Sequence, residues 1–257
     1  MKQQAIGIDI GGSSIKCAIV DIERGVLVSD RHSVRSPAMS AIAAMYDAVA
    51  EALPPDSDAL PAGVAFPGVV KSGIVCTAAH VAEDWIGHPL ATTASERLDR
   101  DIVALNDADA AGLAEMHFGV ARNCTGTVLV LTLGTGIGSA LFVDGQLLPN
   151  TELGHLEVDG REAELRAAAR IRTEQGLTWP AYTSELERVV NRMHALLWPD
   201  LVVLCGGITE DHPELATDLQ ARCPIKVGTL RVDAGLVGAA LATRLTRGAW
   251  LTPSRGG

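Results

Sequence analysis

The chain has 257 residues, which is enough for one large domain or two modest lobes with a substantial buried core. Its formal net charge of −10 argues against general nucleic-acid binding, because a phosphate backbone requires a concentrated basic face. No apolar run approaches the length that spans a bilayer, and the first residues lead directly into an apolar strand with no room for a signal peptide.

The five cysteines are widely scattered, odd in number and without a Cys-x-x-Cys pair. This pattern predicts buried thiols in a reducing cytoplasm, and it argues against a disulfide framework and against a structural zinc site. Only four lysines are present, so arginine supplies most of the positive charge. If the protein handles phosphates, we expect backbone amides, helix ends and metal ions to hold most of them.

In the first half of the chain, short apolar runs between tight turns predict strands, and the first three form an antiparallel meander. An alanine-rich stretch has helical spacing and is ended by Pro54-Pro55. Another helix follows the last of these strands and runs to about Phe118. The expected strands are 4–10, 15–21, 26–28, 62–66 and 102–105, and the alanine-rich helix is 38–52.

The same order of elements recurs in the second half, with a Gly-rich turn between two strands and an Asp144-Gly145 hairpin signal. The expected strands are 126–133, 139–143 and 201–205, and the expected helices are 161–175, 180–197 and 235–247. A strand–Gly-turn–strand unit followed by helices therefore occurs once in each half. This repetition predicts a duplicated α/β lobe with a cleft between the copies.

The first Gly loop, Asp9-Ile10-Gly11-Gly12-Ser13-Ser14-Ile15-Lys16, lies between two strands. Walker loops and dinucleotide fingerprints both open a helix, so neither fits this context. Glycine at the tip of a hairpin lets backbone amides approach a phosphate, and the Ser13 and Ser14 hydroxyls add donors. Asp9, at the strand end, is placed to hold a magnesium ion or its water shell. The alternative is an ordinary Gly-Gly turn with a flanking Asp.

The second Gly loop, Thr132-Leu133-Gly134-Thr135-Gly136-Ile137-Gly138, repeats this arrangement in the other half of the chain. One strand-flanked Gly loop is weak evidence for phosphate binding. Two such loops, one in each predicted lobe, predict a clamp on a phosphoryl donor.

Two polar segments are candidates for binding a hydroxyl-bearing acceptor. Asn106-Asp107-Ala108-Asp109 lies where a strand becomes a helix, so its side chains could cap the helix alone. Alternatively, one carboxylate accepts the proton of a sugar hydroxyl as the hydroxyl attacks phosphorus, and Asp107 is the preferred candidate over Asp109. Glu152 and His155 flank Gly154, where a carboxylate and an imidazole can both reach a vicinal diol. Here the alternative is a surface turn in which the hydrogen bonds of the His are made within the protein.

Taken in order, these motifs resemble the ROK family of sugar kinases and repressors, over nearly the whole chain. Within the family, they closely resemble kinases that phosphorylate glucose with polyphosphate or ATP. The most specific runs are Asn106 to Gly112, Thr132 to Leu141 and Pro149 to Leu156. The resemblance implies the actin-like ATPase (ribonuclease H-like) fold. Its implied lobes are residues 1–105 and 106–234, with a helix over 235–250 packing back on the first lobe.

The resemblance also implies roles for individual residues. Asp107 is the expected general base that deprotonates the glucose 6-hydroxyl, with Mg²⁺ as cofactor. Asn106, Glu152 and His155 are expected to bind the other hydroxyls. The resemblance further implies a homodimer that binds a sugar and either polyphosphate or a nucleoside triphosphate. The expected donor contacts are Gly11, Gly12, Ser13, Lys16, Thr135 and Gly136, with Gly206-Gly207 bordering the donor.

Three features depart from the family pattern. No cysteine cluster follows His155, so we expect no zinc. His80 stands in the sugar-side segment where the family has asparagine, which alters the hydrogen bonds offered to the sugar. Glu210-Asp211 follows Gly206-Gly207 where polyphosphate users carry lysines, and like charge there repels a polyanion.

The departures leave two alternatives open beside a glucose kinase. One is a catalytically weak sugar-binding relative, and the other is an ATP-dependent kinase of a different hexose. A DNA-binding repressor is disfavoured, because the first phosphate loop begins at residue 9, where repressors carry a helix-turn-helix.

Overall fold

The computed structural model describes residues 3–37, 41–58, 60–79 and 81–245. The chain forms two compact units. Unit 1 comprises residues 1–114 and 233–257, and unit 2 comprises residues 115–232. Unit 1 therefore includes residues 106–114, which the sequence analysis assigned to the second lobe.

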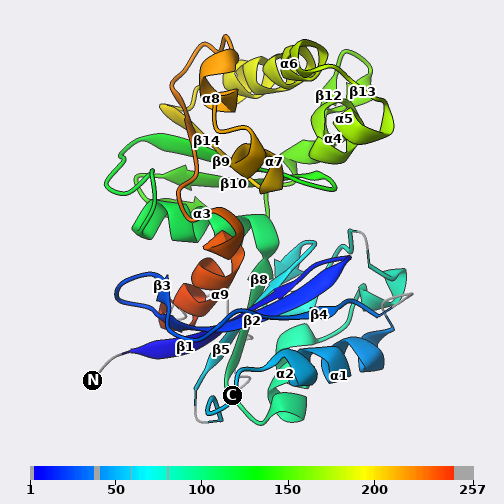
Figure 1. The fold of residues 1–257 in the computed structure, drawn as a ribbon, viewed down its shortest axis with the longest axis vertical. Coiled ribbons are helices and arrows are strands. Elements are labelled where there is room, and N and C mark those ends of the chain that lie inside the picture. Colours follow the sequence, from blue (N-terminus) through cyan, green and yellow to red (C-terminus); the bar gives the residue numbers. More distant parts are fainter. Residues whose placement is uncertain (1–2, 38–40, 59, 80, 246–257) are drawn as a thin grey trace. The chain divides into compact units, whose positions relative to one another are not determined.

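Unit 1 is built on a six-stranded sheet in the order β3-β2-β1-β5-β8, with β4 paired to β2 (Figure 1). β1 is antiparallel to β2 and parallel to β5, and β5 is parallel to β8. The strands are β1 (Gln4–Ile10), β2 (Ser14–Asp21), β3 (Val26–Leu27), β4 (His32–Arg35), β5 (Ala62–Phe66) and β8 (Ile102–Asn106).

Helices cover both faces of this sheet, so its central strands are almost continuously buried (Figure 1). α1 (Ile42–Ala52) and α2 (Leu90–Leu98) lie on one face, and α9 (Ala234–Leu245) lies on the other. α3 (Asp107–His117) starts directly after β8 and runs across the boundary between the units. A small hairpin of β6 (Val70–Lys71) and β7 (Ile74–Val75) precedes the 3-10 turn η2 (Glu83–Trp85).

α9 approaches the sheet so closely that only glycine fits beneath it. A Cβ on Gly7 of β1 would overlap the backbone of Leu236, and one on Gly63 of β5 would overlap the backbone of Ala239. Gly238 of α9 meets the backbone of α3 at Ala110 in the same way. These close approaches explain why a helix far along the chain packs on the first strand.

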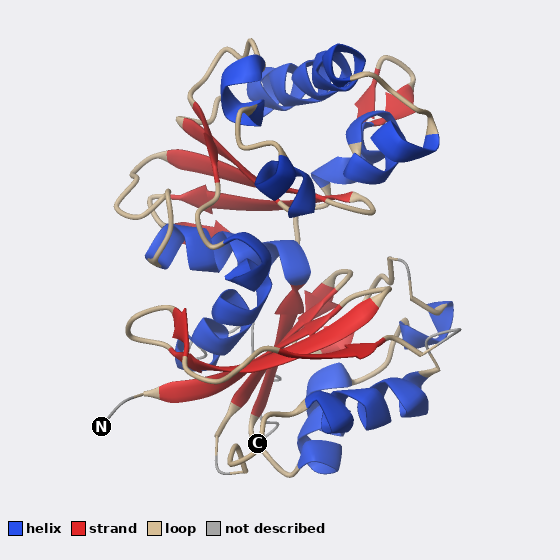
Figure 2. Ribbon diagram, in the orientation of Figure 1, coloured by secondary structure: helices blue, strands red, loops and turns tan. Residues whose placement is uncertain are grey.

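Unit 2 repeats this topology with a five-stranded sheet in the order β11-β10-β9-β14-β15 (Figure 2). β9 is antiparallel to β10 and parallel to β14, as β1 is to β2 and β5. The predicted duplication of an α/β lobe is therefore confirmed. The strands are β9 (Thr127–Leu133), β10 (Ile137–Val143), β11 (Gln146–Leu148), β14 (Leu201–Cys205) and β15 (Ile225–Val227).

The helices of unit 2 pack on its sheet around a second apolar core. The longest, α6 (Trp179–Leu197), begins at Thr178, whose hydroxyl accepts a hydrogen bond from the Ala181 amide. The others are η3 (Leu153–His155), α4 (Ala163–Ala167), α5 (Ala169–Glu174), α7 (Gly207–Asp211), α8 (Leu215–Asp218) and, at the unit boundary, η4 (Arg231–Asp233).

The prediction of one helix over 161–175 is wrong. A hairpin of β12 (Glu157–Val158) and β13 (Arg161–Glu162) comes first, and the helix then breaks between α4 and α5. Ala168 at the break has an extended backbone, with φ −59° and ψ 148°, and is fully buried. No Pro or Gly marks this position, so packing of a small residue, and not a local breaker, interrupts the helix.

The prediction that the cysteines are buried holds for only part of the set. All five are free thiols, with Cys17 and Cys205 buried, Cys124 and Cys223 partly buried, and Cys76 exposed. Burial raises the pKa of Cys17 to about 12, so this thiol is not a nucleophile at neutral pH. Among the described residues, none of the helices combines the length and apolar character that a bilayer crossing requires.

The close approach of α9 predicts a steep cost for a single methyl group. Gly63→Ala places a Cβ against the Ala239 backbone and should lower the free energy of unfolding by about 1–3 kcal/mol, measured by urea denaturation. Gly207→Ala is the matched control, since its Cβ meets no atom within 4 Å. Equal stability of the two variants would contradict the packing described.

Candidate active site

The first Gly loop forms the predicted hairpin between β1 and β2. The Gly11 amide donates to the Ser14 carbonyl at 3.0 Å, which closes the turn. Ser36 anchors the loop from outside: its hydroxyl donates to the Gly11 carbonyl at 2.5 Å, and its amide donates to the Ser13 carbonyl at 3.1 Å. Gly12 and Ser13 are exposed at the tip. The turn is therefore held in shape while its tip is open to a ligand.

Asp9 and Lys16 lie opposite each other on β1 and β2. Lys16 Nζ is 3.2 Å from Asp9 Oδ2, and the two side chains are 31% and 19% exposed. A Cβ on Gly235, at the start of α9, would lie 3.5 Å from the carboxylate carbon of Asp9. Asp9 is therefore paired with its cross-strand cation and lies near the start of α9.

Asn106 at the end of β8 caps α3. Its Oδ1 accepts hydrogen bonds from the amides of Ala108 at 2.8 Å and Asp109 at 3.0 Å. Its Nδ2 donates to the Gly68 carbonyl at 3.1 Å, and the residue is 4% exposed. The capping reading is thus observed for Asn106, and its contact with a sugar stays a prediction.

Asp107 and Asp109 differ in burial. Asp109 is 1% exposed, whereas Asp107 is only partly buried at the first position of α3. Asp107 Oδ1 accepts from the Ala108 amide at 2.8 Å, which fixes the carboxylate against the helix start. Of the two, Asp107 is the carboxylate that an acceptor hydroxyl can reach.

The sheet topology brings these groups of unit 1 to one edge. β1, β5 and β8 are parallel neighbours, so the turns after their carboxyl ends adjoin one another. The phosphate loop follows β1, Gly68 follows β5 and Asp107 follows β8. This edge of an open α/β sheet is where such folds bind ligands.

The second Gly loop joins β9 and β10, and its Gly134 amide donates to the Gly136 carbonyl at 3.0 Å. Gly206 and Gly207 follow the neighbouring parallel strand, because Cys205 pairs with Thr132. A Cβ on Gly206 would overlap the Leu133 carbonyl, so this turn also needs glycine. Thr135 in the second Gly loop and Gly207 in the neighbouring turn are both exposed at the carboxyl edge of the second sheet.

A pocket of about 270 Å³ opens beside the second Gly loop, within unit 2. Its lining is Gly134, Thr135, Ala169, Arg170, Arg172, Thr173, Ile208, Asp211 and His212. Arg170 and Arg172 come from α5, and the Arg170 amide donates to the Gly134 carbonyl at 3.2 Å. Two arginines and two residues of the Gly loop therefore line the same pocket.

These two arginines were not predicted from the sequence. In a continuous helix over 161–175 they have no mark that separates them from surface arginines. The helix break at Ala168 is what turns α5 toward the Gly loop. Arg172 also lies 5.4 Å from the centre of the Trp179 ring, which stacks on His212 at 3.9 Å.

Of the two carboxylates predicted to repel polyphosphate, Asp211 lines the pocket and Glu210 does not.

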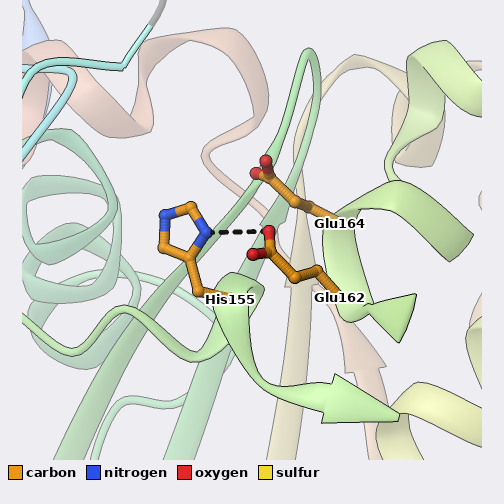
Figure 3. Close-up of side chains that lie close together, drawn as sticks. All are labelled: His155, Glu162 and Glu164. Carbon is orange, nitrogen blue, oxygen red and sulfur yellow. Dashed lines mark hydrogen bonds and ion pairs between the residues drawn. The ribbon is translucent and has the colours of Figure 1, made fainter. Parts of the chain in front are cut away.

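Glu152 and His155 lie together in unit 2 at η3, with His155 Nε2 3.8 Å from Glu152 Oε2. Burial raises the pKa of the Glu152 carboxyl, and the nearby His155 opposes that shift. The Nδ1 atom of His155 lies 3.1 Å from Glu162 Oε2 (Figure 3). The hydrogen bond that His155 donates to Glu162, opposed by burial, raises the pKa of the His155 imidazole.

Ligand atoms of His155, Glu162 and Glu164 all lie within 4.8 Å of one another. That spacing is compatible with a cation, but exposed acidic groups commonly reach it without one. The expectation of no zinc stays a prediction. His80 lies outside the described residues. The two Gly loops belong to different units, so the clamp that joins them also stays a prediction.

The capping bonds of Asn106 predict a stability loss on truncation. Asn106→Ala removes the cap of α3 and strips the buried Gly68 carbonyl of its partner, which should cost about 2 kcal/mol in thermal or urea unfolding. Asn191→Ala is the control, because its two backbone bonds are 3.3 Å long and exposed. If both changes cost the same, the buried cap has no special role.

Comparison with known proteins identifies the family of this chain. The family model described as "ROK family" matches residues 5–171. A polyphosphate glucokinase of Mycobacterium tuberculosis is 42% identical over 243 residues, covering 94% of this chain and 92% of that protein. A polyphosphate glucokinase of Mycobacterium leprae is 41% identical over 94% of this chain and 75% of that protein.

Solved structures match as well. The crystal structure of an inorganic polyphosphate/ATP-glucomannokinase from Arthrobacter sp. strain KM is 42% identical, with a TM-score of 0.90 over 95% of this chain and 99% of that chain. A ROK family glucokinase from Streptomyces griseus, at 22% identity, shares the fold with a TM-score of 0.79. The two repeated sheets are those of the actin-like ATPase fold, and this chain belongs to the ROK family.

Proposed function

We propose that this protein is a sugar kinase that transfers a phosphoryl group to the 6-hydroxyl of glucose or a close hexose. The donor is polyphosphate or a nucleoside triphosphate. The observation that carries the proposal is the common edge of unit 1, where the carboxylate of Asp107 after β8 and the phosphate loop after β1 lie on either side of the turn after β5. The names of relatives 42% identical over nearly the whole chain support the same substrates.

Asp107 acts as general base in this proposal. It sits at the start of a helix, held by the Ala108 amide, so its position is fixed before the acceptor arrives. It takes the proton of the attacking hydroxyl, a step that contributes about 10²–10⁴-fold in rate. The remaining hydroxyls of the sugar are oriented in this proposal by Glu152, His155, Asn106 and His80.

The donor's phosphates are held by the two Gly loops. Gly11, Gly12, Ser13 and Ser14, with Lys16, face the donor in unit 1, where the Gly11 amide closes the turn and the tip residues offer amides and hydroxyls. Thr132, Gly134, Thr135, Gly136 and the Gly206-Gly207 turn face it in unit 2. Asp9 would hold Mg²⁺, directly or through water, and the ion would neutralise charge on the donor's phosphates. Asp9 fits this role as a partly exposed carboxylate, a ligand that Mg²⁺ prefers.

Arg170 and Arg172 extend the donor site in unit 2. The chain as a whole is acidic, and yet two arginines line one pocket. Guanidinium is always charged at neutral pH and matches the geometry of phosphate oxygens. These arginines offset the repulsion from Asp211, so the pocket binds a polyanionic donor.

Removal of the proposed base is the first test. Asp107→Asn should lower kcat for glucose 6-phosphate formation by about 10²–10⁴-fold in a coupled assay, while glucose binding by calorimetry persists. Asp101→Asn, an exposed change at the other end of β8, is the control and should keep normal turnover. A near-normal kcat for Asp107→Asn would contradict the assignment of Asp107 as the general base.

Removal of a pocket cation is the second test. Arg172→Met should raise the KM for polyphosphate roughly tenfold, the effect of losing one charge-assisted hydrogen bond, and leave the KM for glucose unchanged. The exposed Arg192→Met carries the same charge loss on α6 and should not alter either constant. Equal effects of the two variants on the donor KM would mean that the pocket does not hold the donor.

A further inference from the structure

The first Gly loop is held from outside by one buried serine that no sequence motif marks. Ser36 follows β4, and its hydroxyl donates to the Gly11 carbonyl at 2.5 Å. Its amide donates to the Ser13 carbonyl at 3.1 Å. The residue is 8% exposed, so water competes little for these bonds. A single residue therefore takes two carbonyl groups of the phosphate loop.

The sheet brings Ser36 to the loop. β4 pairs antiparallel with β2, and Arg35 at its end lies opposite Ser14. The bond from the Ser36 amide extends this pairing by one residue. Pro37 comes next, and a residue before proline is restricted to extended backbone, which suits the end of a strand. Strand pairing thus places Ser36 beside Gly11, although 25 positions separate them in the chain.

The two bonds decide which peptide groups the tip offers to a ligand. In a planar trans peptide, the C=O and the following N–H point in opposite directions. Because the Gly11 carbonyl is turned to Ser36, the Gly12 amide is turned away from it. The Ser13 carbonyl has the same effect on the Ser14 amide. A phosphate binds amide hydrogens and is repelled by carbonyl oxygens, so Ser36 removes acceptors from the tip and leaves donors there.

The amides at the tip are open to a ligand. Gly12 and Ser13 are exposed, and among the residues that the structure describes neither amide donates a hydrogen bond. The Gly11 amide differs, because it closes the turn on the Ser14 carbonyl at 3.0 Å. The loop therefore combines a fixed turn with two amides that a phosphate can reach.

Unit 2 holds the equivalent carbonyl of its own Gly loop. Gly11 directly follows β1, and Gly134 directly follows β9, the corresponding strand of the repeat. The Gly134 carbonyl accepts a hydrogen bond from the Arg170 amide at 3.2 Å. The donor is a serine hydroxyl in one unit and a backbone amide in the other. Both Gly loops thus have the same carbonyl turned aside, by different chemical means.

We propose that Ser36 is a positioning residue for the phosphoryl donor, which keeps the Gly11 and Ser13 carbonyls turned aside so that the tip amides face a phosphate. This inference rests on the proposed function, in which the first Gly loop binds the donor. The Ser36 hydroxyl is occupied by the Gly11 carbonyl. Its contribution is to fix the loop in its binding conformation before the donor arrives, which lowers the cost of ordering the loop on binding.

Steady-state kinetics with glucose, and with whichever of polyphosphate and ATP the wild type uses, tests this role. Ser36→Ala should raise the KM for the donor about three- to tenfold, the effect of losing one buried hydrogen bond, and leave the KM for glucose unchanged. Ser36→Thr keeps the hydroxyl and should retain the wild-type donor KM. Ser36→Cys keeps the volume with a weaker hydrogen-bond donor and should lie between. An unchanged donor KM in Ser36→Ala would overturn the proposal.

Ser57→Ala is the matched control. Ser57 belongs to the same unit, is 2% exposed and donates through its hydroxyl to the Pro54 carbonyl at 2.6 Å. The change removes the same kind of bond from the connection between α1 and β5. It should lower the midpoint of urea unfolding about as much as Ser36→Ala does, with both KM values unchanged. A rise in donor KM that is equal in the two variants would reduce the effect to stability and overturn the proposal.

Amide NMR of the full-length protein separates this inference from the proposed function, because it needs no turnover. Inorganic tripolyphosphate, added to the protein without sugar, should shift the signals of Gly12 and Ser13 in the wild type. Ser36→Ala should need about three- to tenfold more of it for the same shifts. The inference fails if neither signal shifts in the wild type, or if both proteins titrate alike. If the titrations behave as expected but the wild type phosphorylates no sugar, the proposed function fails and the role of Ser36 in phosphate binding stands.

Discussion

The close approach of α9 to the first sheet is the constraint on which unit 1 depends. Gly7 and Gly63 let the helix backbone lie directly on β1 and β5, where any side chain would push it away. The same helix starts near Asp9, two residues beyond Gly7 on β1, since a Cβ on Gly235 would lie 3.5 Å from the Asp9 carboxylate carbon. The helix that packs on the core of this unit therefore also borders its phosphate loop.

The repeated topology explains why both Gly loops occupy equivalent places. In each unit the loop joins the central strand to its antiparallel neighbour, and the parallel strands beside it end at the same edge. The units then differ in what they add to that edge. Unit 1 adds a carboxylate at the start of α3, and unit 2 adds two arginines from α5. The repeat thus provides similar loops, and the chemistry comes from the helices that follow.

Much of the candidate site was predictable, because strands, glycine turns and strand-end carboxylates are local patterns. Asn106 shows the limit of that reasoning, since one residue type serves both capping and hydroxyl binding, and only its bonds to the Ala108 and Asp109 amides reveal the cap. Arg170 and Arg172 show another limit. Their approach to Gly134 depends on a helix break at a buried alanine, which no propensity marks.

The sequence by itself determined where strands end in glycine turns and which family the motifs belong to, since both depend on residues that are neighbours in the chain. The tertiary structure alone decided which side chains meet. The contact of Glu162 with His155 depends on the register of one hairpin, and the pocket depends on where α5 turns toward the second Gly loop. Such contacts arise from packing between elements, which local propensity does not encode.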